Sequence, residues 1–171
     1  GPGRGHPEHR HLRPVAPDDF DFIFMLQGDP ELMRYIRPPE SDPEVVRKRM
    51  TMWLDYARDN PGLGTFIAVW KASGAPVGNC VLRHLDYQPG SDLEVGYVLM
   101  KEYWGRGLAT EITKALTERA FAAFQVARLV AVTDPDNQLS QKVLTKCGFQ
   151  PAGRRFIYDS ENLEFILTRP A

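Results

Sequence analysis

The sequence predicts an α/β fold: one mixed sheet of about seven strands, flanked by about four helices. Three observations lead to this prediction. Apolar residues recur at helical spacing through most of residues 18–60. Strand-like segments separated by turn residues then fill residues 65–100, as in an antiparallel meander. Finally, strand and helix patterns alternate to the end of the chain in the order β-α-β-α-β-β.

The first 60 residues contain the first strand and two helices. Residues 12–15 read as a short edge strand, where Pro14 is tolerated. Asp18 and Asp19 can cap a helix that ends at residues 28–30. A turn or short helix follows at residues 31–36. A longer helix then begins at Ser41 or Asp42, with Pro43 in its first turn, and closes at residues 60–62.

The rest of the chain alternates strands with helices. The strands are expected at residues 65–70, 76–85, 93–100, 127–133, 149–158 and 162–168. The helices are expected at residues 106–124 and 137–147, the second capped by Gly148. Gly78 inside a strand indicates a bulge or close packing. Residues 159–162 are expected to join the last two strands.

Composition favours an ordinary globular domain. The chain has 171 residues, 43% of them hydrophobic and 25% charged, with a net charge of −1. This balance gives no sign of binding to nucleic acid or to an anionic membrane surface. No apolar run approaches the roughly 18 residues of a membrane-spanning helix. Two cysteines make no disulfide framework, so a reduced, cytoplasmic setting is expected.

The N-terminus begins Gly1-Pro2-Gly3, which resembles the remnant of an engineered protease site. We therefore expect residues 1–9 to be this remnant and a flexible tail, and residues 10–171 to form a single domain. The histidines near this end are interpreted as part of the polar tail, and no metal site is expected.

Residues 103–111, Tyr-Trp-Gly-Arg-Gly-Leu-Ala-Thr-Glu, lie between a predicted strand and a predicted helix. The first turn of a helix has unpaired backbone N–H groups and a partial positive charge. Gly105 and Gly107 would let a bulky anion approach that backbone without a Cβ in the way. The stretch therefore predicts a cradle for an anion, most plausibly phosphate.

Two common nucleotide-binding motifs do not match this loop. A Rossmann fingerprint needs a third glycine where Thr110 stands, and the lysine of a P-loop is absent. A glycine-rich helix start without a ligand is the alternative interpretation.

A second motif follows the strand at residues 127–133. It comprises Asn137, Ser140, Leu144, Lys146, Gly148 and Phe149. Together with the loop at residues 104–109, this spacing resembles the GNAT superfamily of N-acetyltransferases. The loop variant looks like the branch of ribosomal-protein N-terminal alanine acetyltransferases. The resemblance spans about residues 10–169. It implies the acyl-CoA N-acyltransferase fold, in which strands four and five splay apart and admit the pantetheine arm of coenzyme A.

The resemblance also implies which residues bind acetyl-CoA, the expected cosubstrate. Backbone N–H groups near Val98 to Met100 would polarise the thioester carbonyl, and Asn137 would contact the pantetheine amide. The full set of expected coenzyme-binding residues is Val98, Leu99, Met100, Trp104, Gly105, Arg106, Gly107, Leu108, Ala109, Thr110, Asn137, Ser140 and Leu144.

Acetyl transfer to an amine needs a base for the ammonium and an acid for the leaving thiolate. By the resemblance, Glu94 and Asp159 stand where the family places a base, and they are the candidate bases; a solvated strand position and a hairpin turn are their structural alternatives. Many family members carry a tyrosine acid where this chain has Leu144. Ser140 is the candidate substitute, and a residue that satisfies the helix N-terminus is its alternative.

The sequence thus predicts an acetyl-CoA-dependent N-acetyltransferase that acts by direct attack in a ternary complex. The acceptor is a primary amine, either a protein N-terminus or a small molecule. Neither nucleic acid nor membrane is an expected partner, and a homodimer is left open. The alternative is a non-catalytic acyl-CoA-binding or regulatory module on the same fold.

Overall fold

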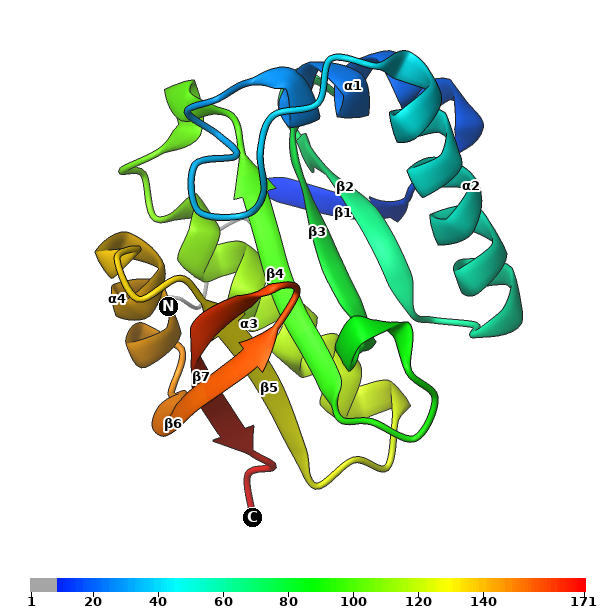
Figure 1. Cartoon of the computed structure of the whole chain (residues 1–171). Helices are drawn as coiled ribbons and strands as arrows, with labels where there is room; N and C mark the ends of the chain where they lie inside the picture. The colour runs from blue at the N-terminus through cyan, green and yellow to red at the C-terminus, as the bar shows by residue number, and fades with distance from the viewer. Residues whose placement is uncertain (1–8) are drawn as a thin grey trace.

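In the computed structural model, which describes residues 9–171, a seven-stranded sheet is flanked by four helices (Figure 1). The helices are α1 (Phe20–Gly28), α2 (Pro43–Asp59), α3 (Leu108–Ala123) and α4 (Gln138–Lys146). The strands are β1 (Arg10–Pro14), β2 (Gly64–Trp70), β3 (Pro76–His84), β4 (Leu93–Leu99), β5 (Arg128–Thr133), β6 (Gln150–Ile157) and β7 (Ser160–Thr168). The predicted fold class is confirmed.

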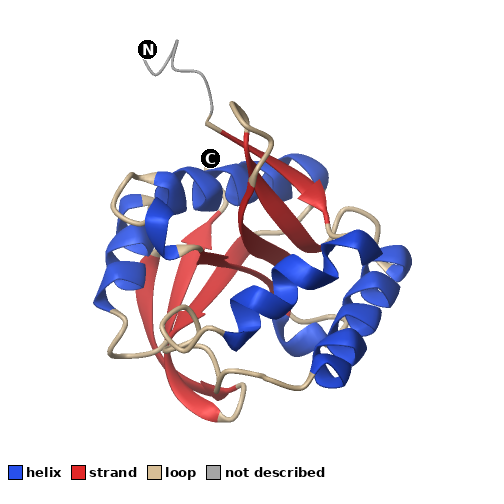
Figure 2. Cartoon of the chain, turned by 90° about the horizontal axis from the view of Figure 1, so that it is seen from above, coloured by secondary structure: helices blue, strands red, loops and turns tan. Residues whose placement is uncertain are grey.

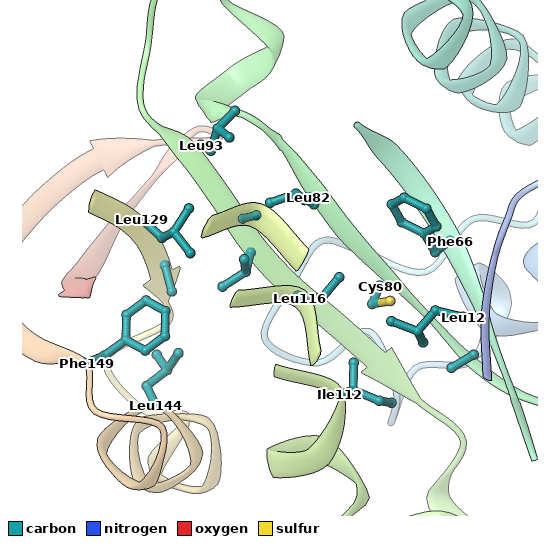
Figure 3. Packing of buried hydrophobic residues seen from close by; sticks show 14 of the residues in the cluster. Leu12, Phe66, Cys80, Leu82, Leu93, Ile112, Leu116, Leu129, Leu144 and Phe149 are labelled. Carbon is teal, nitrogen blue, oxygen red and sulfur yellow. The ribbon is translucent and has the colours of Figure 1, made fainter. Parts of the chain in front are cut away.

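Helices cover both faces of the sheet and bury a core on each (Figure 2). On one face α3 and α4 pack over the sheet: Ile112 and Leu116 lie on α3, and Leu144 and Phe149 lie at the α4 side of the same core (Figure 3). On the other face α1 and α2 form a smaller core, which includes Ile23 and other buried apolar side chains. Burying two apolar faces fixes the register of the strands, because a slip of one residue would exchange the faces.

The sheet order is β1-β2-β3-β4-β5-β7-β6, and β4 with β5 is its parallel pair. These two strands pair only at Leu93 with Leu129 and at Glu94 with Val130. The two strands then diverge, so the edge of β4 from about residue 96 onward has no partner on the β5 side. The splay expected between strands four and five is present.

Gly78 marks an irregularity, as expected. The β2–β3 register shifts between Ala68 and Val69, opposite this glycine. A Cβ at residue 78 would collide with the carbonyl oxygen of Val98 on β4. Only glycine lets β3 and β4 approach this closely.

The turn between the last two strands differs from the prediction. Residues 159–162 were expected to form it, but Ile157 pairs with Ser160, so the turn consists of Tyr158 and Asp159. Both residues have positive φ, 56° and 60°, as a tight two-residue hairpin turn requires. The Asn162 side chain, assigned to the loop in the prediction, instead donates to the carbonyls of Ile157 and Ser160.

The expected tail at residues 1–9 falls outside the described residues, apart from His9. The His9 ring stacks on Trp70 at 5.5 Å, and its backbone N–H donates to Glu111. His9 thus packs against the domain instead of belonging to a free tail. Within residues 9–171, no helix is both long and apolar enough to cross a membrane.

Candidate active site

The glycine-rich loop leads directly into α3. Gly105 and Gly107 have φ of 75° and 79°, and Gly107 is the N-cap of the helix. Within the described chain, the backbone N–H groups of residues 105–110 donate to no protein acceptor. Open space surrounds the position of a Cβ at either glycine. A set of unpaired donors at the positive end of a 16-residue helix is suited to bind phosphate oxygens.

Trp104 fixes this loop to the sheet. Its indole N–H donates to the carbonyl oxygen of Leu99, the last residue of β4, at 2.9 Å. Trp104 is 40% exposed. The side chain expected among the coenzyme ligands therefore also sets the position of the phosphate loop relative to the strand gap.

The backbone of β4 offers fewer free donors than expected at residues 98–100. The Met100 N–H donates to the Val77 carbonyl on β3 at 2.9 Å, so it is already satisfied. Because successive backbone groups of a strand point in opposite directions, the Val98 N–H faces β3 as well. Of the expected three, Leu99 is the residue whose N–H faces the gap, and Tyr97 is the next such residue along β4.

Asn137 and Ser140 stand at the start of α4. The Asn137 side chain accepts from the Ser140 N–H at 3.2 Å and so caps the helix. The Tyr97 side chain reaches toward the Ser140 hydroxyl from β4. Burial raises the pKa of Tyr97, and the Ser140 hydroxyl only partly opposes this shift. Ser140, Asn137, Leu144 and Tyr97 all line the same pocket.

Tyr97 was not predicted as a site residue. The signal available in the sequence was strand alternation, which puts Tyr97 on the same sheet face as Val95 and Leu99 and beside the predicted α4. Nothing in the sequence shows that its hydroxyl meets Ser140, 43 residues further along the chain.

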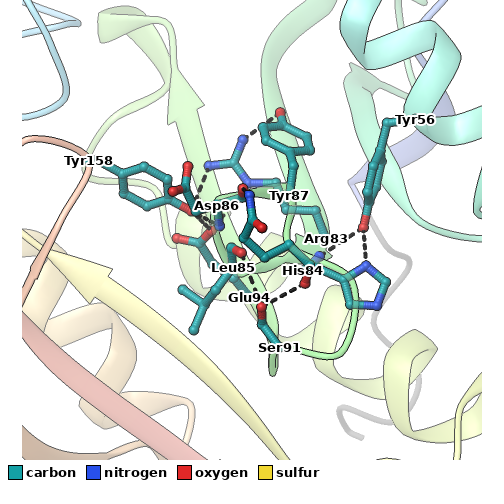
Figure 4. Close-up of polar contacts among 10 residues, drawn as sticks. Tyr56, Arg83, His84, Leu85, Asp86, Tyr87, Ser91, Glu94 and Tyr158 are labelled. Carbon is teal, nitrogen blue, oxygen red and sulfur yellow. Dashed lines mark hydrogen bonds and ion pairs between the residues drawn. The ribbon is translucent and has the colours of Figure 1, made fainter.

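Glu94 lies where β4 and β5 stop pairing and is 4% exposed. Figure 4 shows it beside Arg83 and Tyr158. Its carboxylate accepts from the Arg83 guanidinium at 3.2 Å and from the Tyr158 hydroxyl. The solvated strand position that was its structural alternative is therefore wrong. Burial opposes the charge of Arg83, but Glu94 and the hydroxyls of Tyr87 and Tyr158 offset that cost and raise the pKa of Arg83.

Two turns whose residues have positive φ hold together the cluster of Arg83, Tyr87, Glu94 and Tyr158. Among the described residues, the non-glycine positions with positive φ are Asp86, Tyr87, Tyr158 and Asp159. Tyr87 accepts from Arg83 at 2.6 Å, and Tyr158 accepts from the Asp86 N–H at 2.9 Å while donating to Glu94. Non-glycine residues in this region cost about 1–3 kcal/mol each and persist where surrounding contacts hold them in place.

Asp159 is exposed in the β6–β7 turn and does not line the pocket, whereas its neighbours Tyr158 and Ser160 do. Its positive φ matches the hairpin-turn role that was its alternative. The structure brings Glu94 and Ser140 to one pocket and leaves Asp159 at the rim.

The pocket has a volume of about 220 Å³ and runs from α1 and α2, through the strand gap, to α4. Glu94 with Arg83 and Tyr158 lies on one side, and Ser140 with Tyr97 on the other. Such a site can place a base and an acid on opposite sides of one reacting centre.

Comparison with known proteins decides the family. Residues 9–150 match the family model of the acetyltransferase (GNAT) domain. The chain belongs to the GNAT acetyltransferase family. It is accordingly an acetyltransferase that uses acetyl-CoA.

Individual GNAT relatives agree with this assignment. The uncharacterized N-acetyltransferase p20 of Bacillus licheniformis is 28% identical over 147 residues, which cover 85% of this chain and 82% of that protein. The putative ribosomal N-acetyltransferase YdaF of Bacillus subtilis is 26% identical over 149 residues, covering 86% and 81%. Among solved structures, the aminoglycoside acetyltransferase AAC(6')-Ib in complex with coenzyme A superposes with a TM-score of 0.78. It is 17% identical, with coverage of 94% of this chain and 95% of that one.

Proposed function

We propose that this GNAT protein transfers the acetyl group of acetyl-CoA to a primary amine by direct attack in a ternary complex. The observation that carries the proposal is the set of unpaired N–H groups at residues 105–110, placed next to a gap between parallel strands. The gap leads from this phosphate-type cradle to a pocket with a buried carboxylate. The structural neighbour AAC(6')-Ib is in complex with coenzyme A, which supports coenzyme A as a ligand of this fold.

The residues divide between the two substrates. The N–H groups of residues 105–110 would bind the pyrophosphate, and Asn137 and Leu144 would contact the pantetheine arm. The thioester carbonyl would accept from the Leu99 or Tyr97 N–H, which face the gap. Such donors stabilise the negative charge that develops on the carbonyl oxygen as the amine attacks.

Proton transfer would use both sides of the pocket. An ammonium first loses a proton toward Glu94, directly, through water or through the Tyr158 hydroxyl that bonds to it. The neutral amine nitrogen then attacks the carbonyl carbon, the C–S bond breaks, and the thiolate takes a proton from the Ser140–Tyr97 pair. The nitrogen loses its second proton as the amide forms, so one proton is released per turnover. Asp159 at the rim stays a candidate base, although it would need bridging water.

A thiol-release assay with acetyl-CoA and a panel of peptides and small amines tests this function. We expect release that depends on the amine, with the acetylated amine detected by mass spectrometry. Tight coenzyme A binding without thiol release from any amine would favour the non-catalytic module instead. Failure to bind coenzyme A would contradict both.

A further inference from the structure

Arg37 lies in the segment between α1 and α2, and this segment is held in place by its own contacts. The Glu40 N–H donates to the Gln27 carbonyl at 2.8 Å, and Arg49 donates to the Gln27 side chain at 2.6 Å. Arg49 also pairs with Glu40 at 3.6 Å. With Pro38 and Pro39 directly after it, Arg37 is attached to a stiffened loop at the pocket wall.

The pocket around Arg37 is largely apolar on the α1–α2 side. It is lined there by Leu26, Met33, Tyr35, Ile36 and Trp53. Four charged residues also line it: Arg37, Arg83, Glu94 and Asp134. Glu94 forms an ion pair with Arg83 and accepts a hydrogen bond from Tyr158. Asp134 accepts a hydrogen bond from the Asp136 N–H beside α4. Among residues 9–171 no carboxylate pairs with Arg37, so one positive charge in this wall is uncompensated.

The surroundings of Arg37 are unfavourable for its charge. Arg37 is exposed, but desolvation by the surrounding protein is the largest cause that lowers its pKa, followed by the charges of Arg49 and Arg83. An arginine still keeps its proton at neutral pH. A bound anion would relieve both the desolvation and the repulsion, and a planar carboxylate matches the fork of a guanidinium.

We propose that the acceptor amine also carries a carboxylate on an apolar body, as a free hydrophobic amino acid does, and that Arg37 binds this carboxylate. The inference rests on the proposed function, because it names the acceptor of that same site. The apolar body would contact Trp53 and Met33, while the amine points toward the gap at Glu94. The same uncompensated charge would disfavour polycationic acceptors such as aminoglycosides.

Matched pairs of amines that differ only in the carboxylate test the proposal. Phenylalanine is compared with phenethylamine, leucine with 3-methylbutylamine, and kanamycin serves as a polycation. We expect the parent enzyme to prefer the carboxylate member of each pair. Arg37→Ala should raise the KM of that member roughly 10- to 100-fold, the range for one charge-assisted bond, and leave its partner amine unchanged. Arg37→Glu should reverse the preference.

Arg34→Ala is the control, because it removes the same charge from the same segment. Arg34 lies over the Tyr35 ring and does not line the pocket. The proposal is overturned if the parent enzyme prefers the amines without a carboxylate, or if Arg37→Ala weakens both members of a pair equally.

A binding measurement separates this inference from the proposed function. If no amine releases thiol, the proposed function fails, and calorimetry with coenzyme A present decides the inference. Phenylalanine binding that is lost in Arg37→Ala and kept in Arg34→Ala supports the anion site. Absence of phenylalanine binding to the parent protein rejects it.

Discussion

At the residue scale, the chemistry depends on contacts between side chains that are far apart in the sequence. Glu94 meets Tyr158 across 64 positions, and both meet Arg83. The family resemblance could indicate Glu94 as a candidate, because the superfamily often places a glutamate on the strand that leads to the glycine-rich loop. It could not predict Tyr158, Tyr97 or Arg37, since each acquires its place only when separate elements come together.

The first prediction separates the two candidate bases. We expect Glu94→Gln to lower kcat by roughly 10- to 10⁴-fold, the range for one general base, and Asp159→Asn to have little effect. The loss should shrink as pH rises toward the amine pKa near 10, because the acceptor then arrives deprotonated. The coenzyme dissociation constant should barely change. Rates from pH 6 to 9 with a verified amine provide the measurement.

A stability control is needed for this variant, because Glu94→Gln leaves the buried Arg83 charge without a counter-ion. Breaking such a pair typically costs about 3–5 kcal/mol. The double variant Glu94→Gln with Arg83→Met should regain stability in urea unfolding without regaining activity. Full activity of Glu94→Gln across this pH range would refute its role as the base.

The second prediction concerns the leaving thiolate. Tyr97→Phe keeps the ring that packs on the core and removes the hydroxyl that meets Ser140. We expect a lower kcat, by about 10- to 100-fold, the lower part of the range for acid–base catalysis. If the pair acts as a unit, adding Ser140→Ala should cost little more than either change alone. Fully additive effects would mean that the two hydroxyls act independently.

At the element scale, most boundaries followed from capping and turn residues. Asp42 accepts from the Glu44 N–H at 2.9 Å before Pro43, as the start of α2 required. The β6–β7 turn was missed because a tyrosine and an aspartate occupy positions where Asn-Gly is the usual signal. Bonds from Tyr158 to Glu94 and to the Asp86 N–H compensate for that strain, and no local pattern encodes them.

The connection from β1 to α1 gives a prediction for acid stability. Asp19 accepts both guanidinium nitrogens of Arg13 at 2.8 Å and the Ala16 N–H at 2.8 Å. The bond to Arg13 is the main cause that lowers the pKa of Asp19. Because the pKa of Asp19 is lower in the folded state than in the unfolded state, the charged carboxylate stabilises the protein at pH values above the unfolded pKa, which is near 4. This stabilisation is lost as the pH falls through the pKa of the folded state.

We therefore expect Asp19→Asn to lower the free energy of unfolding by about 1–3 kcal/mol at pH 6. The difference from the parent should diminish below about pH 4 as Asp19 becomes protonated. Urea unfolding at pH 6, 4 and 3 gives the comparison. Asp18→Asn, at an exposed neighbouring position, should change little at any of these pH values. A pH-independent defect in Asp19→Asn would mean that charge is not the cause.

The loop before α3 gives the next prediction. Gly107→Val should weaken coenzyme A binding on the order of 100-fold, since a side chain there occupies the space in front of several donors. Gly74→Val is a matched control, because Gly74 has φ of 75°, similar open surroundings and a place in the β2–β3 turn. In both variants the free energy of unfolding should fall by about 1–2 kcal/mol, because valine is strained in the left-handed conformation. Calorimetry showing equal coenzyme affinity in both would reject the cradle.

At the scale of the whole molecule, the sheet is nearly two half-sheets. Strands β1–β4 form one and β5–β7 the other, and two residue pairs join them. The order of elements in the sequence indicated a mixed sheet, and the family resemblance implied its splay. The placement of β7 between β5 and β6 depends on long-range pairing that local patterns do not specify.

Acetyl-CoA should stabilise this divided sheet, because its pantetheine arm would lie between the two halves and accept from the free edge of β4. When the free acetyl-CoA concentration is 100 times the dissociation constant, ligand binding raises the free energy of unfolding by about 2.7 kcal/mol. For a domain of this size, that corresponds to a rise in Tm of roughly 5–10 °C. Hydrogen exchange should slow most at the Tyr97 and Leu99 amides, which face the gap, and least at Val98 and Met100, which already face β3. A rise in Tm with uniform slowing along β4 would place the ligand outside the gap. No rise at saturating acetyl-CoA would contradict the coenzyme site itself.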